Sequence, residues 1–302
     1  MDGFINVLKP PGMSSHDVVA WARKTFQQKK VGHTGTLDPG AAGVLVLAMG
    51  KATRLSEYVL NLQKSYRCLL RLGVTTDSGD SYGNVISTSL VRDVSNKEIS
   101  LVLSHFTGEI EQIPPMTSAI KINGKKLYEL ARKGETVARK KRKITIFSLD
   151  FVRRSTDGEK KDFFLDVTCS KGTYIRTLCA DIGSALGCGG MMQFLVRTAV
   201  GPFLLKEAFS LDELSNISSH PTQFLYPMDT ALRDLPKVRL PEERITVKLQ
   251  NGGTARVCRE FEAGAGTEVA VYDHCDQFIA IAIIEESSSG STILRPRKVL
   301  YL

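Results

Sequence analysis

The sequence predicts an α+β fold followed by a small all-β module. Before residue 236, segments with strand and helix patterns alternate without a regular strand–helix–strand repeat, which favours an α+β sheet over a doubly wound parallel one. Residues 236–302 differ, because they contain short apolar runs, turn sequences and no convincing helical pattern. We therefore predict two domains in the 302-residue chain, at residues 1–235 and 236–302.

The elements of the first domain are predicted from periodicity and chain-breaking residues. Residues 3–8 form a strand that ends at a Lys-Pro-Pro-Gly sequence, and Ser14 or Ser15 then caps a helix. A glycine-rich loop at residues 32–43 follows this helix. The remaining elements are a buried strand at 44–49, a helix at 52–60, a half-buried strand at 64–72, a helix opened by a Ser95–Glu98 capping box, a strand at 163–169 and a helix that follows Gly172.

The composition excludes several classes of protein. Hydrophobic residues are 42% and charged residues 24% of the chain, so wholesale disorder is excluded. The six cysteines never form a Cys-x-x-Cys pair, which indicates reduced thiols rather than a disulfide framework or a zinc ribbon. No apolar run approaches the ~20 residues of a membrane helix, and the N-terminus does not resemble a secretory signal. We expect a cytoplasmic protein that does not bind a membrane.

No metal or nucleotide-cofactor signature is present in the sequence. The five histidines lack ligand spacing, and Asp77 and Asp80 stand in a turn-like sequence without a neighbouring His or Glu. A P-loop, a Rossmann glycine motif and a Gly-x-Ser-x-Gly motif are all missing. We therefore predict no metal and no cofactor.

The net positive charge is concentrated in one segment. The chain carries 40 basic and 32 acidic residues, a net charge of +8. Residues 121–143 hold ten basic and two acidic side chains, so this segment alone accounts for the whole excess. One interpretation is contact with a polyanion such as RNA, with Tyr128 as a stacking group. The alternatives are a solvated surface loop or a targeting run at residues 139–143.

Several residues are candidates for chemistry, each with a structural alternative. Asp38 lies in the glycine-rich loop, where a carboxylate can act as base or nucleophile or can cap a turn. Arg176, in the first turn of its helix, could pair with a buried carboxylate or form a surface salt bridge. Tyr66 lies on the inward face of its strand and could stack on a base or fill the core. His33 by itself indicates only a buried hydrogen-bonding loop residue.

Ordered motifs make the chain similar to the tRNA pseudouridine synthase B (TruB) family. Residues 32–39 (GHTGTLDP) and 43–45 resemble its catalytic-loop motif, and the similarity extends over about residues 3–235. The supporting segments are 6–12 with Ser15, 64–66 with 72–80, 112–115 with 118–121 and 131–134, 169–178 with 181–183, and 195–198 with 201–203. The chain departs from the family's usual motifs at two places. Val196 stands where the family usually has a basic residue, and the Gly-Ala-Ala sequence at residues 40–42 differs from the usual loop sequence.

This resemblance implies a pseudouridine synthase fold, with a mixed, mainly antiparallel central sheet flanked by helices and a C-terminal PUA-like module. The implied reaction converts uridine 55 in the T arm of tRNA to pseudouridine without metal or cofactor. The implied roles are Asp38 as nucleophile, Tyr66 as the ring that stacks on the target base, Arg176 as partner of the aspartate, Leu195 as a wall of the base pocket, His33 as the residue that fills the place of the flipped uridine, and Lys64 and Tyr174 as pocket supports.

The basic insertion at about residues 112–145 resembles the family's RNA clamp. Its candidate RNA-binding residues are Lys121, Lys125, Lys126, Tyr128, Arg132 and Lys133. We expect the T-arm stem-loop of tRNA as the partner, a monomer, and no obligate protein partner. Two rival functions stay open at this point: an RNA-binding module or tRNA chaperone without catalysis, and a synthase that depends on a guide RNA.

Overall fold

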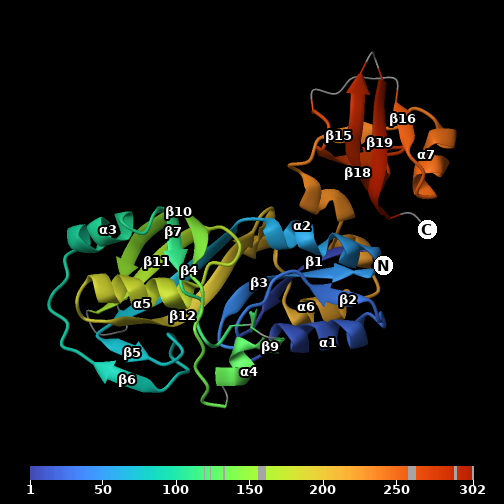
Figure 1. Cartoon of the computed structure of the whole chain (residues 1–302). Coiled ribbons are helices and arrows are strands. Elements are labelled where there is room, and N and C mark those ends of the chain that lie inside the picture. The colour runs from blue at the N-terminus through green and yellow to red at the C-terminus, as the bar shows by residue number, and fades with distance from the viewer. Residues whose placement is uncertain are drawn as a thin grey trace.

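Two β-sheets organise the computed structural model, which describes residues 1–118, 120–122, 124–131, 133–155, 161–257, 263–288 and 291–300 (Figure 1). The larger sheet runs in the order β14 (Leu225–Tyr226), β1 (Gly3–Lys9), β3 (Ala42–Met49), β12 (Gly190–Val200), β4 (Lys64–Leu72), β11 (Asp162–Cys169), β10 (Arg142–Arg154) and β7 (Gly108–Gln112). Strands β2 (Val31–His33) and β13 (Phe203–Leu204) pair with β3 and β12. All pairings described within this sheet are antiparallel except β3–β12. The predicted mixed, mainly antiparallel α+β sheet is therefore confirmed.

The first half of the large sheet is buried on both faces. Helix α1 (Ser15–Thr25) begins at a capping box formed by Ser14 and Asp17, and its Val18 and Ala22 pack against β1 and β3. The other face of β1 and β3 packs against the 3₁₀ helix η1 (Gly50–Leu55) and helix α2 (Ser56–Asn61), which together replace the single helix predicted at 52–60. Because alternate strand residues enter two separate cores, this part of the sheet forms a rigid base for the loop that joins β2 to β3.

The second half of the large sheet is covered by two helices. Strand β4 has the predicted alternation, with Cys68, Leu70 and Leu72 buried against α5 (Ile175–Ala185). Helix α3 (Asn96–Ser104) has Ser95 as its N-cap and packs on β10 and α5, but only half of the predicted capping box forms, because the Glu98 carboxylate pairs with Arg92. A hairpin of β5 (Val74–Thr76) and β6 (Val85–Thr88) projects from the end of β4.

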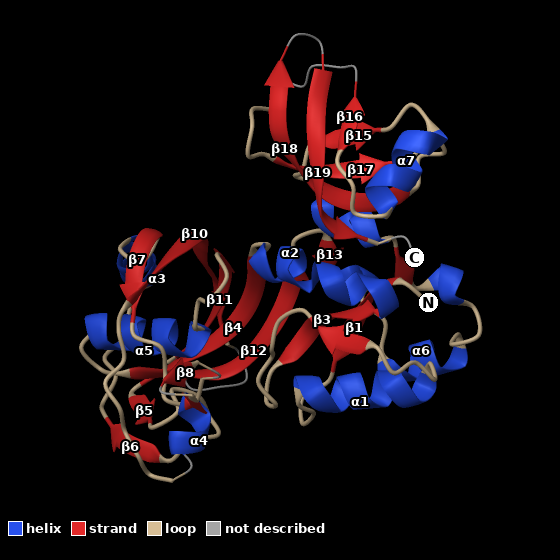
Figure 2. Ribbon diagram, turned by 45° about the vertical axis from the view of Figure 1, so that its right-hand side comes forward, coloured by secondary structure: helices blue, strands red, loops and turns tan. Residues whose placement is uncertain are grey.

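The basic insertion forms a small structure of its own between β7 and β10. It contains the hairpin β8 (Lys121–Ile122) and β9 (Lys125–Lys126) and the short helix α4 (Leu127–Ala131). Figures 1 and 2 both place α4 and the β5–β6 hairpin on the same lower side of the molecule. Two segments that are distant in sequence therefore face the same region of the large sheet.

The C-terminal module is a five-stranded sheet with its own core. Its strands run in the order β15 (Lys237–Arg239), β17 (Glu268–Tyr272), β18 (Phe278–Ser288), β19 (Ser291–Val299) and β16 (Ala255–Val257). Ala270, Tyr272 and Ile281 pack against the core around Phe4 and Leu55, so the module is joined to the large sheet by apolar contacts. Figure 2 shows the module's strands beside the end of the large sheet that contains β1 and β3. We propose residues 236–302 as a separate domain, because β15 is the first strand of this second sheet.

One feature of the module contradicts the all-β prediction. Helix α7 (Glu243–Gln250) lies in the segment for which the sequence shows no convincing helix. Its Ile245, Thr246 and Val247 are β-branched and favour a strand by propensity alone. Ile245 and Leu249, however, are four residues apart and pack together on the module's core, which makes the helix the better solution.

Candidate active site

The loop that carries Asp38 joins β2 to β3 and is held from two sides. The backbone N–H of Leu37 donates to the Ser15 hydroxyl over 2.9 Å, and that hydroxyl donates to the Leu37 carbonyl over 3.0 Å. On the other side, the buried Lys9 ammonium donates to the Pro39 carbonyl over 3.3 Å. The residues directly before and after Asp38 are therefore both fixed by the start of the chain. This arrangement sets the position of the Asp38 carboxylate before any ligand arrives.

Arg197 fixes the neighbouring backbone of this loop through hydrogen bonds to three carbonyls. Its side chain is 2% exposed and donates from Nε to the Val44 carbonyl over 2.7 Å. Its Nη1 and Nη2 donate to the carbonyls of Thr36 and Gly35 over 3.3 and 3.1 Å. The parallel pairing of β12 with β3 brings Arg197 to this position, opposite Gly43. Sequence reasoning missed Arg197 as a support of the site, because the contact depends on sheet order.

Replacement of Gly43 by Ala is expected to displace the loop. Gly43 has φ +109°, and a Cβ there would lie 2.2 Å from the Arg197 carbonyl oxygen. The variant should lose roughly 2–4 kcal/mol of unfolding free energy, through the unfavourable φ and the overlap with backbone, and activity should fall with it. Chemical denaturation checks this, with Gly12→Ala (φ +91° and open space) as the control for φ alone. Equal stability losses in the two variants would contradict the role of the β3–β12 contact.

Arg176 connects Asp38 to two other segments of the chain. Its Nε lies 3.2 Å from Asp38 Oδ2, and its Nη1 lies 3.5 Å from Asp80 Oδ2. The guanidinium also donates to the Ser78 carbonyl over 3.2 Å, and to the hydroxyl and carbonyl of Thr117 at the root of the basic insertion. Arg176 is 6% exposed. The guanidinium is therefore a buried partner of two carboxylates, and its function as partner of the aspartate stays a prediction.

Asp80 is a site residue that sequence reasoning assigned only to a turn. One of its oxygens does have that role, since Oδ1 accepts from the Ser78 hydroxyl over 2.6 Å and from the Tyr82 backbone over 3.0 Å. The other oxygen faces Arg176, so a single carboxylate shapes the turn and shares the guanidinium with Asp38. The only sequence signal was its position in the segment that resembles the family's second motif.

Opposing effects act on the pKa of Asp38. Burial raises this pKa above its ordinary value, whereas the Arg176 guanidinium lowers it; Asp80 then raises it further and Lys9 lowers it. The side chain is still 41% exposed although Oδ2 pairs with Arg176, so a ligand can reach the carboxylate. A ligand that covered Asp38 would strengthen both the burial effect and the attraction to Arg176.

Tyr66 and Leu195 lie on neighbouring strands beside this carboxylate. Leu195 is 6% exposed and belongs to the core cluster that includes Leu37, and Tyr66 packs against the same cluster. Burial raises the pKa of the Tyr66 phenol, and the nearby Asp38 carboxylate adds to the rise while Arg197 opposes it. The phenol therefore stays protonated and presents a neutral ring beside Asp38.

His33 ends β2 next to the loop and stays neutral. Its ring meets that of His16 edge to face with centroids 5.1 Å apart, and its buried Nδ1 has no hydrogen-bond partner among the described residues. Burial, followed by His16 and Arg197, lowers the pKa of His33 to about 4. The ring is therefore a neutral, partly buried group at the edge of the loop that carries Asp38.

The low pKa of His33 is expected to make the unfolding free energy of the protein depend on pH. Between about pH 4 and pH 6.5 the unfolded chain binds a proton at this position and the folded chain does not, so stability falls as the pH drops through this window. Because the ring is partly exposed, we expect about 1–2 kcal/mol from this residue. Urea unfolding of wild type and His33→Gln at pH 7 and pH 5 measures it, with exposed His220→Gln as control. A wild-type loss that His33→Gln reproduces in full would contradict this assignment.

Lys64 and Tyr174 support the frame around the site. The Lys64 ammonium donates to the carbonyls of Leu60 and Leu62 at the end of α2, over 2.5 and 2.6 Å, and burial lowers its pKa to about 8. Tyr174 precedes α5, and its backbone N–H and carbonyl both bond to the Gln112 side chain. Sequence reasoning did not single out Gln112, which fixes the start of the helix that carries Arg176.

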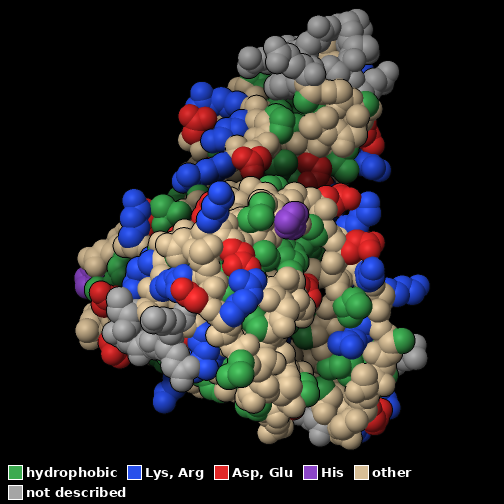
Figure 3. Space-filling model, turned by 90° about the vertical axis from the view of Figure 1, so that its left-hand side faces the viewer, with side chains coloured by type: hydrophobic (Ala, Val, Ile, Leu, Met, Phe, Trp, Pro, Cys, Tyr) green, Lys and Arg blue, Asp and Glu red, His purple; other side chains and the backbone are tan. Residues whose placement is uncertain are grey.

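The basic insertion lies beside this site and is joined to it through Thr117. Lys121 and Lys125 lie on the β8–β9 hairpin, Tyr128 lies on α4, and Lys133 follows it. Arg132 and the side chain of Lys126 lie outside the described part of the chain. Farther along, Lys141 pairs with Glu111 at 3.3 Å and Lys143 with Glu109 at 2.9 Å. On the face of the molecule drawn in Figure 3, basic and acidic side chains are interspersed.

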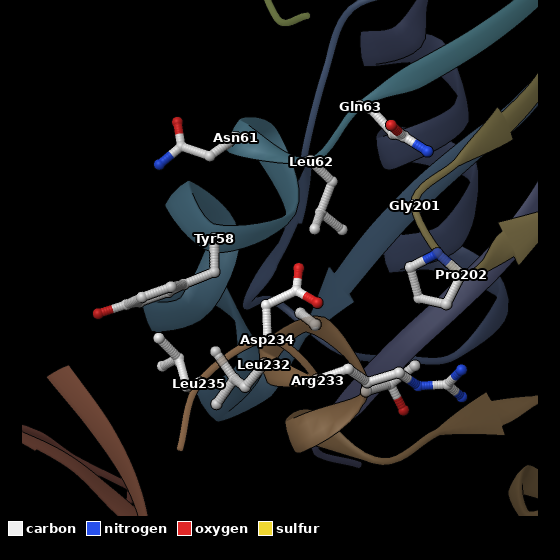
Figure 4. Close-up of a pocket in the computed structure, with 12 residues that line it drawn as sticks. Tyr58, Asn61, Leu62, Gln63, Gly201, Pro202, Leu232, Arg233, Asp234 and Leu235 are labelled. Atoms are coloured by element: carbon white, nitrogen blue, oxygen red, sulfur yellow. The ribbon is translucent and has the colours of Figure 1, made fainter. Parts of the chain in front are cut away.

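A separate cavity of about 620 Å³ lies away from Asp38. Tyr58, Asn61 and Leu62 of the α2 region line one side, and residues 230–235 line the other (Figure 4).

No group of three or more His, Cys, Asp or Glu side chains that could hold a metal is found in the described ranges. No helix in those same ranges is long and apolar enough to cross a membrane.

Comparison with known proteins defines the class to which this fold and site belong. Residues 23–175 match the N-terminal domain of the TruB family pseudouridylate synthases, and residues 176–233 match a tRNA pseudouridylate synthase B C-terminal domain. The structure is also similar to that of a Cbf5-Nop10-Gar1 complex (TM-score 0.75, 28% identity, 99% of this chain and 84% of that chain). A similar match is to an H/ACA RNP bound to a substrate RNA containing 2′-deoxyuridine (TM-score 0.75, 26% identity, 99% and 85%).

Two relatives whose identity to this chain is higher than that of these solved structures are both named tRNA pseudouridine synthase B. The tRNA pseudouridine synthase B of Pelotomaculum thermopropionicum is 47% identical over 272 residues, which cover 87% of this chain and 86% of the relative. That of Alkaliphilus oremlandii is 41% identical over 304 residues, which cover 100% and 99%. The chain belongs to the TruB family of pseudouridylate synthases.

Proposed function

We propose that this chain is a stand-alone tRNA pseudouridine synthase that converts uridine 55 of the T arm to pseudouridine. The observation that carries the proposal is the buried Arg176 guanidinium, which pairs with a partly exposed Asp38 carboxylate beside a neutral Tyr66 ring. Membership of the TruB family and the names of the relatives favour tRNA as the substrate. The protein acts as a cytoplasmic monomer and needs no protein partner, metal or cofactor.

The proposed reaction needs a base that has left its helical stack. The glycosidic bond from N1 breaks and the same uracil is rejoined through C5, so the atoms of substrate and product are the same. A stacked uridine cannot reach Asp38, and flipping it costs a few kcal/mol. Contacts of the basic insertion with phosphates and loop bases offset this cost, while His33 fills the place that the uridine leaves.

In this proposal each residue of the site has one task. The Asp38 carboxylate is the proposed nucleophile, which attacks either C6 of the ring or C1′ of the sugar; on a glycal route it would assist instead, and all three routes require it to be ionised next to the flipped nucleotide. Arg176 keeps it ionised while the base excludes water. The Tyr66 ring stacks on the uracil, and Leu195 forms a wall of its pocket. Lys64 and Tyr174 hold the surrounding backbone in place.

The decisive experiment tests the purified chain on an unmodified tRNA transcript in the presence of EDTA. Mass mapping of pseudouridine should locate the product at position 55. A tRNA chaperone would bind the transcript and leave uridine in place. A guide-dependent synthase would need added RNA, and a metal requirement would contradict the proposed chemistry.

Neutralisation of the basic segment should weaken tRNA binding and its salt dependence. The triple variant Lys140→Gln, Lys141→Gln, Arg142→Gln removes up to three phosphate contacts, so the slope of log Kd against log salt should fall by about 2. Filter binding between low and moderate salt measures the slope. Neutralising exposed Lys24, Lys97 and Lys206 in the same way is the matched control. An unchanged slope in the first variant would show that the segment is only solvated surface.

A further inference from the structure

One exposed aromatic ring lies directly on the catalytic loop. Tyr82, in the turn between β5 and β6, is 75% exposed. Its ring nevertheless contacts Gly40, two residues after Asp38: a Cβ at Gly40 would lie 2.0 Å from Tyr82 Cε2 and 2.5 Å from Cζ. The missing side chain at residue 40 therefore provides the space in which the ring rests. Gly40, the first residue of the Gly-Ala-Ala sequence at 40–42, and the Tyr82 ring are therefore complementary in shape.

The backbone under this ring is fixed on several sides. The Tyr82 N–H donates to Asp80 Oδ1 over 3.0 Å, and Asp80 also faces Arg176. Ser81 donates from its backbone to the Met192 carbonyl over 3.1 Å and from its hydroxyl to the Gln193 carbonyl over 3.0 Å. The turn is thereby attached to β12, the strand that also carries Leu195 and Arg197. Tyr82 thus belongs to the same framework as Asp38.

The Tyr82 ring is exposed beside the loop that carries Asp38, where a ligand can reach it. No hydrogen bond from the Tyr82 hydroxyl is found among the described residues, so the polar end does not anchor the side chain. Glycine covers only a small part of the ring, and most of its surface is open to solvent. Aromatic rings in this situation stack on nucleic-acid bases, which is worth about 1–3 kcal/mol for each base.

We propose that Tyr82 is a substrate-positioning residue that stacks on an unpaired RNA base next to the flipped target nucleotide. This inference rests on the proposed function, since it needs an RNA that brings its target to Asp38. The contact holds the strand beside the catalytic loop and contributes to substrate affinity rather than to the chemical step. Because the ring lies on the β5–β6 turn and not in the basic insertion, it is a second, uncharged point of attachment.

Binding and single-turnover measurements on T-arm stem-loop RNA test this proposal. Binding is measured in an Asp38→Asn background, so that no turnover occurs, and the rate is measured with Asp38 present at saturating enzyme. Tyr82→Ala should raise Kd about 5- to 100-fold, while the saturating rate changes less than about threefold. Tyr82→Phe should restore binding, because the ring stacks without its hydroxyl. Ile86→Ala, an exposed apolar residue on the same hairpin, is the matched control.

Three outcomes would overturn the proposal. The first is a Tyr82→Ala variant that binds RNA as tightly as wild type. The second is a Tyr82→Leu variant that restores binding, because that would show an apolar filler over Gly40 to be sufficient. The third is a fall in the saturating rate with unchanged Kd, which would indicate support of the Asp38 loop instead. Absence of activity in the wild-type chain would contradict the proposed function itself, so the two failures are distinguishable.

Discussion

Replacement of Asp38 by Asn is expected to abolish pseudouridine formation and to leave tRNA binding intact. The amide has the same shape as the carboxylate, but it is neither charged nor nucleophilic. Loss of a nucleophile that acts together with its partners costs about four to six powers of ten in rate. Asp80 stays available to Arg176, so the guanidinium keeps a carboxylate at 3.5 Å and the fold should survive. Single-turnover assays by mass mapping measure the rate.

Binding and stability measurements complete this test. The dissociation constant of the variant for a tRNA transcript should lie within a few-fold of the wild-type value, because phosphate and base contacts from the basic insertion are untouched. Thermal unfolding should show a small change of either sign, since the substitution removes a charge whose burial raises its own pKa. Residual activity near the wild-type level would exclude Asp38 as the nucleophile. Loss of binding together with activity would assign it to recognition instead.

Replacement of Arg176 by Lys is expected to reduce activity far more than stability. The planar guanidinium uses three nitrogens at once, toward Asp38, toward Asp80 and toward Thr117. A lysine ammonium keeps the charge but cannot reach all of these partners with one nitrogen. We expect the single-turnover rate to fall by about three powers of ten, equivalent to about 4 kcal/mol, and unfolding free energy to fall by about 1–2 kcal/mol.

A second arginine–aspartate pair, which also has one buried and one partly exposed partner, provides the control for this prediction. Arg71 donates from Nε and Nη2 to Asp162 over 2.8 and 2.5 Å, and Asp162 is 2% exposed. This pair joins β4 to β11 by two hydrogen bonds from one guanidinium to one carboxylate, and it is no part of the Asp38 network. Arg71→Lys should lose similar stability and keep its activity. If Arg176→Lys behaved in this way too, its ion pairs would be structural only.

Local features of the fold were predictable because they depend on short stretches of chain. The alternation of residues 64–72 gives β4 with the predicted bounds and the predicted inward face. Ser14 and Ser95 each accept a hydrogen bond from the third residue of their helix, as the capping sequences indicate. The helix α7 was missed because β-branched residues favour a strand locally, and only packing on the module's core selects the helix.

The candidate site was predictable in its members and not in its connections. Asp38, Tyr66 and Arg176 were named from the sequence, in part through resemblance to a family. Asp80 was assigned to a turn alone, and Arg197 and Thr117 had no assigned role. These three residues act through carbonyl or guanidinium contacts with segments far away in the chain, which leave no local pattern.

The sequence by itself determined the α+β class, the strand and helix segments near the site, the clustered positive charge and the family. These properties follow from periodicity, capping residues and ordered motifs, all of which are local. Only the tertiary structure decided that Arg176 is shared between Asp38 and Asp80, that Arg197 supports the loop, and that the Tyr82 ring rests on Gly40. The physical reason is that sheet order brings β3, β12 and the β5–β6 turn together. Where these segments meet and water is excluded, an unpaired charge or an additional Cβ atom costs free energy, so each contact there fixes the position of a side chain.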